Sequence, residues 1–275
     1  MTSDVSTGAD LLPTARIDHA EPSVFQAENL LREARRQRGL AAGAVPPFGL
    51  LDPDGDIVRH LQRTGRAERS KVWACYHTDL WETALGDQRL GVVGCVVGAP
   101  FAVLVAEQLF ASGCQLLISV TSAGQIADDL ELPCFILIDR ALRGEGTSHC
   151  YLPPAMMVEA DAAALAGAAR GLAGAGVAIR RGMTWTTDAP YRETGSAIEH
   201  ARAAGALAVE MEAAGLYALS RAKGLPIICF AHVTNQMAQD EGDFEKGPGD
   251  GAQEALRVAA AAASAWPAWA NSAAP

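Results

Sequence analysis

Apolar residues gather in segments along this chain, and amphipathic segments separate them. Residues 89–98 (RLGVVGCVVG) and 115–120 (QLLISV) are almost continuously apolar, which is typical of strands buried on both faces. Further strands are predicted at 134–142, 177–187, 207–210 and 226–235, and helices at 23–40, 100–113, 153–176, 212–224 and 252–266. The helix at 153–176 is expected to open at its two prolines. This alternation predicts an α/β fold, with a mostly parallel or mixed central sheet flanked by helices.

No repeat or linker divides the pattern, so residues 23–275 are predicted to form one domain behind a flexible tail at 1–22. The first residues lack the charged and apolar regions of a signal peptide, and we expect a cytoplasmic protein. The longest apolar run, residues 91–106, is too short to span a membrane.

Composition excludes several kinds of partner. A net charge of −10 argues against nucleic acid or an anionic membrane as the main ligand. The six cysteines form no CxxC pair, so we expect neither a zinc site nor a disulfide framework, and no metal. The Walker, HExxH and GxSxG motifs are also missing from the sequence.

Polar clusters follow four of the predicted strands. Their sequences are SVTSAGQ (119–125), TWTTDAPYRET (184–194), VEMEA (209–213) and HVTNQM (232–237). Ligands of α/β sheets usually lie beyond the carboxyl ends of strands. Four such clusters in one chain therefore predict one site built from several loops.

Glu210 and Glu212 flank Met211 in otherwise apolar surroundings, where carboxylates are costly unless they have a role. A carboxylate accepts two hydroxyl groups at once, so Glu212 is suited to a vicinal diol such as that of ribose. Alternatively, Glu212 interacts with the dipole of the following helix. Met211 is either a core residue or a soft surface beneath a sugar or base.

The segments VEMEAAGLYA, TTDAPYRET and TSAGQI together resemble the nucleoside phosphorylase family, which includes uridine phosphorylase and hexameric purine nucleoside phosphorylase. The resemblance spans roughly residues 50 to 265. It implies a nucleoside phosphorylase-like fold and cleavage of an N-glycosidic bond by phosphate, with no further cofactor. It also implies a homo-oligomer, such as a dimer or a trimer of dimers.

The resemblance assigns roles to single residues. Glu212 and Met211 are expected to bind ribose, with Glu210 nearby, and Glu212 counts with Asn235 as catalytic. The residues expected at the base are Pro190, Tyr191, Arg192, Asn235 and Gln125. Tyr191 can stack on a base, whereas Pro190 stands where the family usually has an aromatic residue. Asn235 can hydrogen-bond a leaving base but cannot protonate it as an acid would.

The phosphate site matches the family less well. Gly55, Asp56 and Arg59 fit its Gly-Asp-x-x-Arg spacing, and Ser122 keeps the hydroxyl of the glycine-containing loop. Two further arginines of the family align with Ser119 and Glu82, and a glutamate repels phosphate. Phosphorolysis is the leading hypothesis because Arg59 remains, and hydrolysis by water is a close alternative. The third alternative is a nucleoside-binding protein without turnover.

Two other segments have competing interpretations. His149 and Cys150 could suggest a nucleophile pair, but a solvated loop is favoured. Residues 240–251 (DEGDFEKGPGDG) are acidic and rich in glycine. They are interpreted as a lid, a solvated loop or a cation site.

Overall fold

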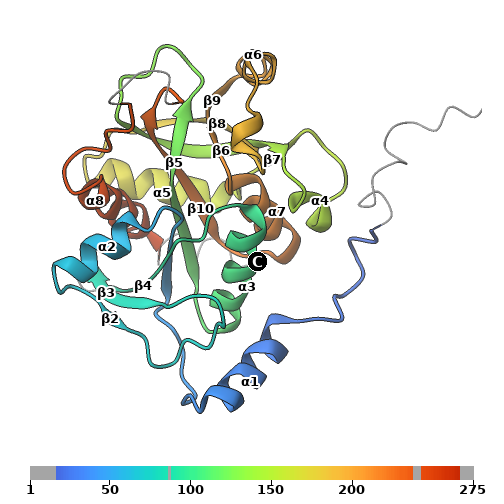
Figure 1. Ribbon diagram of the computed structural model, residues 1–275, viewed down its shortest axis with the longest axis vertical. Helices are drawn as coiled ribbons and strands as arrows, with labels where there is room; N and C mark the ends of the chain where they lie inside the picture. The colour runs from blue at the N-terminus through green and yellow to red at the C-terminus, as the bar shows by residue number, and fades with distance from the viewer. Residues whose placement is uncertain (1–16, 86–87, 238–242, 267–275) are drawn as a thin grey trace, which may run out of the picture.

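A computed structural model describes residues 17–85, 88–237 and 243–266 (Figure 1). Most of the tail predicted at residues 1–22 lies outside these ranges. Along the longest axis of the molecule, helix α6 (Gly195–Ala203) lies at one end and α1 (Ala27–Arg38) at the other. No helix in the described ranges combines the length and the apolar character that crossing a bilayer requires.

One mixed sheet forms the centre of the fold, in the order β10-β6-β8-β9-β5-β1-β4-β3-β2. The strands are β1 (Phe48–Asp52), β2 (Glu68–Arg69), β3 (Trp81–Leu85), β4 (Gln88–Gly94), β5 (Leu116–Gln125), β6 (Cys134–Gly144), β7 (Met157–Glu159), β8 (Arg180–Thr187), β9 (Ala206–Glu210) and β10 (Ile227–Asn235). Strand β10 also pairs with β5, so part of the sheet closes on itself. Both parallel and antiparallel pairs occur, which confirms a mixed sheet.

Helices cover the sheet in two groups. The remaining helical elements are α2 (Asp56–Arg63), α3 (Ala99–Ala111), α4 (Ser148–Tyr151), α5 (Ala162–Gly174), the 3-10 helix η3 (Pro190–Arg192), α7 (Ala213–Lys223) and α8 (Ala252–Ala263). Helix α8 packs against α5 and α2, whereas α7 packs against α3 and α4. Every residue of β1 and of β10 is buried, as expected for strands between helical layers.

The prediction for residues 153–176 was wrong in its first third. Residues Met157–Glu159 form β7 and pair with the outer end of β6, and the helix begins only at Ala162. Asp161 is the N-cap, and its carboxylate accepts the N–H of Ala164 at 2.8 Å. The two prolines therefore precede a short strand and do not open the helix.

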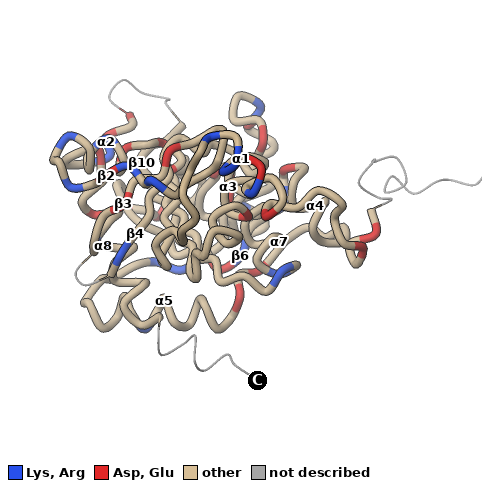
Figure 2. Tube along the Cα trace, turned by 90° about the horizontal axis from the view of Figure 1, so that it is seen from below, with Lys and Arg blue, Asp and Glu red and all other residues tan. Residues whose placement is uncertain are grey.

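Strand register brings the functional segments together. Strands β1, β5 and β10 are parallel, so their carboxyl ends meet at one edge of the sheet. Strand β9 runs antiparallel to β5, with Val209 opposite Gly124. Because the two strands are antiparallel, the residues after Val209 lie beside the residues of β5 before Gly124. Glu212 therefore lies beside Thr121. Figure 2 shows acidic and basic residues interspersed along the chain, with both signs close to α2.

Candidate active site

Glu212 lies at the turn between β9 and α7 and is almost completely buried. Its Oε1 accepts the backbone N–H of Gly98 at 2.7 Å, and its Oε2 accepts the hydroxyl of Thr121 at 2.8 Å. Gly98 has a φ of 88°, which favours glycine at the residue preceding α3. The turn after β9, strand β5 and the start of α3 thus converge on this carboxylate, and their contacts orient both of its oxygens.

Glu210, not Glu212, caps α7 through its side chain. Its Oε2 accepts the N–H groups of Glu212 and Ala213, each at 2.7 Å, and its Oε1 accepts the hydroxyls of Thr184 and Thr186. Glu212 occupies the N-cap position by backbone only, without a side-chain bond to the helix. The structure therefore gives Glu210 a structural partner for each oxygen. Its ribose role, like that of Met211, stays a prediction.

Burial shifts the acidity of both glutamates. It raises the pKa of Glu212 to about 8, and the nearby charge of Glu210 adds to this effect. Burial also raises the pKa of Glu210. The bonds from Gly98 and Thr121 act in the opposite direction because they stabilise the ionised form of Glu212. Near neutral pH, Glu212 can therefore change its protonation state.

The predicted base-contacting residues fall into two groups. Asn235 ends β10 opposite Gly124, and its amide donates to the Ala123 carbonyl at 3.4 Å while its Oδ1 accepts the N–H of Met237 at 2.9 Å. Gln125 donates to the carbonyl of Ala127 at 2.8 Å and so holds the loop after β5. Both amides thus lie at the edge of the sheet that carries Thr121, one buried and one half-buried.

Pro190, Tyr191 and Arg192 form the short helix η3 and are all exposed. The side chain of Tyr191 is 99% exposed, so in a single chain its ring faces solvent. The fold does not bury Pro190 and Tyr191 against the described parts of the site. A stacking role would therefore require a bound base or a second chain to cover the ring, and it stays a prediction.

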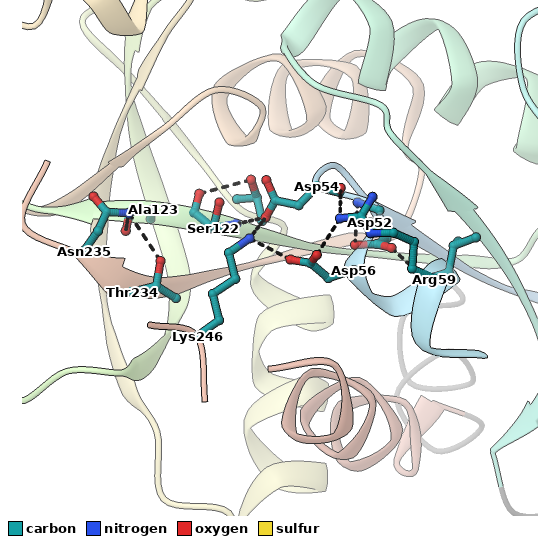
Figure 3. Close-up of polar contacts among 12 residues, drawn as sticks. Asp52, Asp54, Asp56, Arg59, Ser122, Ala123, Thr234, Asn235 and Lys246 are labelled. Atoms are coloured by element: carbon teal, nitrogen blue, oxygen red, sulfur yellow. Dashed lines mark hydrogen bonds and ion pairs between the residues drawn. The ribbon is translucent and has the colours of Figure 1, made fainter. Parts of the chain in front are cut away.

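The predicted phosphate residues form a cluster that includes their own counter-charges (Figure 3). Gly55 has a φ of 80° and precedes α2. Arg59 donates to Asp56 at 2.5 Å and to the carbonyl of Asp54 at 2.9 Å. The N–H of Ser122 donates to Asp54 Oδ2 at 3.2 Å. The Arg59 guanidinium and the N–H of Ser122 therefore already contact groups of this chain.

A small cavity lies among these groups, with a volume of about 20 Å³. Its polar lining consists of Asp52, Asp54, Asp56, Thr121, Ser122, His232, Lys246 and Asp250. The ammonium of Lys246 lies 2.6 Å from Asp56 and 3.2 Å from Asp54. Figure 3 shows Lys246 reaching both aspartates, with Asn235 on its other side.

Titratable groups around the cavity have shifted acidities. Burial raises the pKa of Asp52 to about 7 and lowers that of His232 to about 4. Burial alone would raise the pKa of Asp56, but Lys246 and Arg59 bring it below its usual value. At neutral pH, His232 is therefore uncharged, and Lys246 is the cation among the described residues that line the cavity.

Sequence reasoning did not select Thr121, Asp54 or Lys246 for the site. The segment DPDGD directly after an apolar strand was a usable signal, because its acids must lie at the edge of the sheet. Lys246 is a cation within an otherwise acidic, glycine-rich segment. Neither signal reveals the partner, since Lys246 and Asp54 are 192 residues apart.

The two positions that replace family arginines have different surroundings. Ser119 is buried in β5, and its hydroxyl has no hydrogen-bond partner among the described residues. Glu82 lies on β3 and pairs with Arg89 at 2.8 Å, so its carboxylate already has a counter-ion within the chain. Glu82 is not among the residues that line the cavity.

His149 and Cys150 belong to the short helix α4 rather than to a loop or strand. His149 contacts Arg143 through its Nδ1 at 3.2 Å, and the Cys150 thiol points to the Gly146 carbonyl at 3.8 Å. These separate partners give no nucleophile pair. Of the predicted lid at 240–251, the first three residues lie outside the described ranges.

Comparison with known proteins identifies the family. Residues 53–266 match the phosphorylase superfamily, and the chain belongs to it. The chain is 29% identical over 236 residues to a uridine phosphorylase of Thermococcus kodakarensis, covering 75% of this chain and 84% of that protein. It is 30% identical over 129 residues to a guanosine phosphorylase of Halorubrum lacusprofundi, covering 47% of this chain and 54% of that protein.

Solved structures show the same fold. An AMP nucleosidase from Bacteroides thetaiotaomicron superposes with a TM-score of 0.68 at 19% identity, covering 89% of this chain and 98% of that one. The predicted resemblance to the nucleoside phosphorylase family is thus confirmed, and so is the predicted fold class. At this identity the superposition shows the fold alone.

Proposed function

We propose that this protein cleaves the N-glycosidic bond of a nucleoside with water as the nucleophile, giving free base and ribose. Membership of the phosphorylase superfamily supports the class of bond that is cleaved. The choice of water rests on the acidic cavity beside Thr121. This choice reverses the order of the two nucleophiles that the sequence alone favours.

The acidic lining of the cavity carries the proposal. The cavity has room for a water molecule, which requires roughly 10–15 Å³. The lining also offers the carboxylate and hydroxyl groups with which a buried water forms its hydrogen bonds.

The balance of charge in the cluster also favours water over phosphate. Asp54 and Asp56 together balance Lys246 and Arg59, so the cluster has no excess positive charge for a phosphate dianion. Like charges such as a carboxylate and a phosphate repel each other by several kcal/mol when a few Å apart near a protein surface, about 4 kcal/mol for unit charges at 4 Å. Water carries no such penalty.

The proposal gives each side of the site a role. Glu212 accepts the ribose hydroxyls and holds the sugar, and Asn235 hydrogen-bonds the leaving base. The water oxygen attacks the anomeric carbon, its proton passes to a carboxylate of the cavity, and the C–N bond breaks with its electron pair on the base. The carboxylates also stabilise the positive charge that develops on the ribosyl ring.

An assay of base release tests this proposal. The full chain is incubated with uridine, guanosine, inosine, adenosine and AMP, with and without inorganic phosphate. We expect base release at the same rate in both conditions, with ribose and no ribose 1-phosphate. Release that requires phosphate would overturn the proposal.

Phosphorolysis is the second candidate, and the curated relatives favour it. The two relatives compared above are named as phosphorylases, one for uridine and one for guanosine. The same assay identifies phosphorolysis by ribose 1-phosphate. Binding of a nucleoside without release of base would instead indicate the non-catalytic alternative.

A further inference from the structure

We propose that Asp54 selects water over phosphate, because its carboxylate fills the anion position formed by the N–H of Ser122 and the ammonium of Lys246. This inference rests on the proposed hydrolytic function and adds a specificity-determining residue to it. Asp54 belongs to the turn between β1 and α2, beside the cavity that holds the water in the proposed reaction.

Two donors meet at one oxygen of Asp54. Its Oδ2 accepts the N–H of Ser122 at 3.2 Å and the ammonium of Lys246 at 3.2 Å. A backbone N–H together with an ammonium group is a donor pair that binds phosphate oxygens in other sites. The carboxylate of Asp54 therefore takes both of these contacts from any incoming anion (Figure 3).

The neighbouring aspartates cannot replace Asp54 in this role. Asp52 accepts the N–H groups of Gly55 and Val58 and so stabilises the start of α2. Asp56 contacts Lys246 and Arg59 but no backbone N–H among the described contacts. Within the described part of the chain, Asp54 alone of these three aspartates contacts both the N–H of Ser122 and Lys246.

The partial exposure of Asp54 and Lys246 is consistent with competition between the Asp54 carboxylate and anions from solution. The side chain of Asp54 is 30% exposed and that of Lys246 is 19% exposed, so both are near the surface yet partly shielded from water. Partial shielding strengthens their attraction relative to that of an exposed pair. Removal of the Asp54 carboxylate would leave a cation and an N–H directed at a space of about the volume of the lost group.

The variant Asp54→Ser tests the inference, with Asp56→Asn as its matched control. Both substitutions remove one negative charge near Lys246, but only the first frees the N–H of Ser122. Binding of inorganic phosphate to each full-length protein is measured by calorimetry. Base release is measured with and without phosphate, and ribose 1-phosphate is quantified.

We expect D54S to bind phosphate at least about tenfold more tightly than the parent, because two charge-assisted contacts become available. It should also form ribose 1-phosphate, whereas D56N should gain clearly less, because Asp54 still occupies the N–H of Ser122 and contacts Lys246. Equal gains in D54S and D56N would overturn the inference in favour of a general charge effect. No gain in D54S would also overturn it.

Further measurements separate the possible failures. If the parent releases base without phosphate and D54S gains nothing, the inference fails and the hydrolytic function stands. If the parent itself requires phosphate, both fail. Circular dichroism checks that D54S is folded, and Asp54→Ala is a second variant that frees both donors. Unchanged phosphate binding in a folded D54A together with an unfolded D54S would also reject the inference.

Discussion

The site has two sides, which satisfy their carboxylates in different ways. The side proposed for ribose, around Glu212, is called the ribose side, and the side around Asp54 and Lys246 is called the anion side. Glu212 is buried and receives only neutral donors, among them Gly98 and Thr121, and burial raises its pKa. Asp54 is partly exposed and receives a cation as well as an N–H. A carboxylate with neutral donors can exchange them for substrate hydroxyls, whereas one paired with an ammonium is held in place. The first arrangement suits binding and the second suits exclusion.

The largest expected effect comes from replacing the Glu212 carboxyl. Glu212→Gln keeps the volume of the side chain but replaces one of its two oxygens with an amide NH₂, and kcat/KM should fall roughly ten- to a hundredfold. A 2′-deoxynucleoside should lose less than the ribonucleoside, since it lacks one of the hydroxyl groups. Steady-state kinetics on both substrates measure this. Activity that is unchanged in a folded variant would remove Glu212 from the site.

The second expected effect concerns pH and stability. Burial raises the pKa of Glu212 to about 8, compared with about 4.3 for an unfolded glutamate. Between these values the folded chain binds more protons than the unfolded chain. This contribution to the free energy of unfolding is therefore complete below the lower value and is lost as pH rises toward 8.

Urea denaturation at several pH values between about 5 and 8 measures this slope. The variant Glu212→Gln should flatten the slope without abolishing it, because burial also raises the pKa of Asp52, to about 7. An identical slope in parent and variant would show that Glu212 titrates at its ordinary value. The buried, neutral-donor description of the ribose side would then be wrong.

The smallest effect is expected on the anion side, from Arg59→Ala. The side chain of Arg59 is 54% exposed and already paired with Asp56, so its loss should change base release by less than about twofold. Rates at fixed nucleoside with varied phosphate measure this. A marked rise in the KM for phosphate would instead support phosphorolysis and would reverse the comparison between the two sides.

Local patterns were sufficient for the layers of the fold and for singling out Glu212 as a buried carboxyl. Apolar runs that alternate with helices predicted the mixed, covered sheet, because a strand buried on both faces must be apolar throughout. Glu212 was recognisable as a carboxylate at the junction between a strand and a helix, within a motif of contiguous residues. The start of the helix at 162 was missed because the pairing of β7 with β6 is not a local property.

Only the tertiary structure decided the anion side. The contact between Lys246 and Asp54 joins segments 192 residues apart, and no spacing rule in the sequence predicts which charges will pair. Arg59 had the spacing of a phosphate ligand, but the fold places its guanidinium against Asp56. Sequence determines which groups follow each strand, whereas ion pairing depends on distances between those groups that arise only when β1, β5 and the segment after β10 come together.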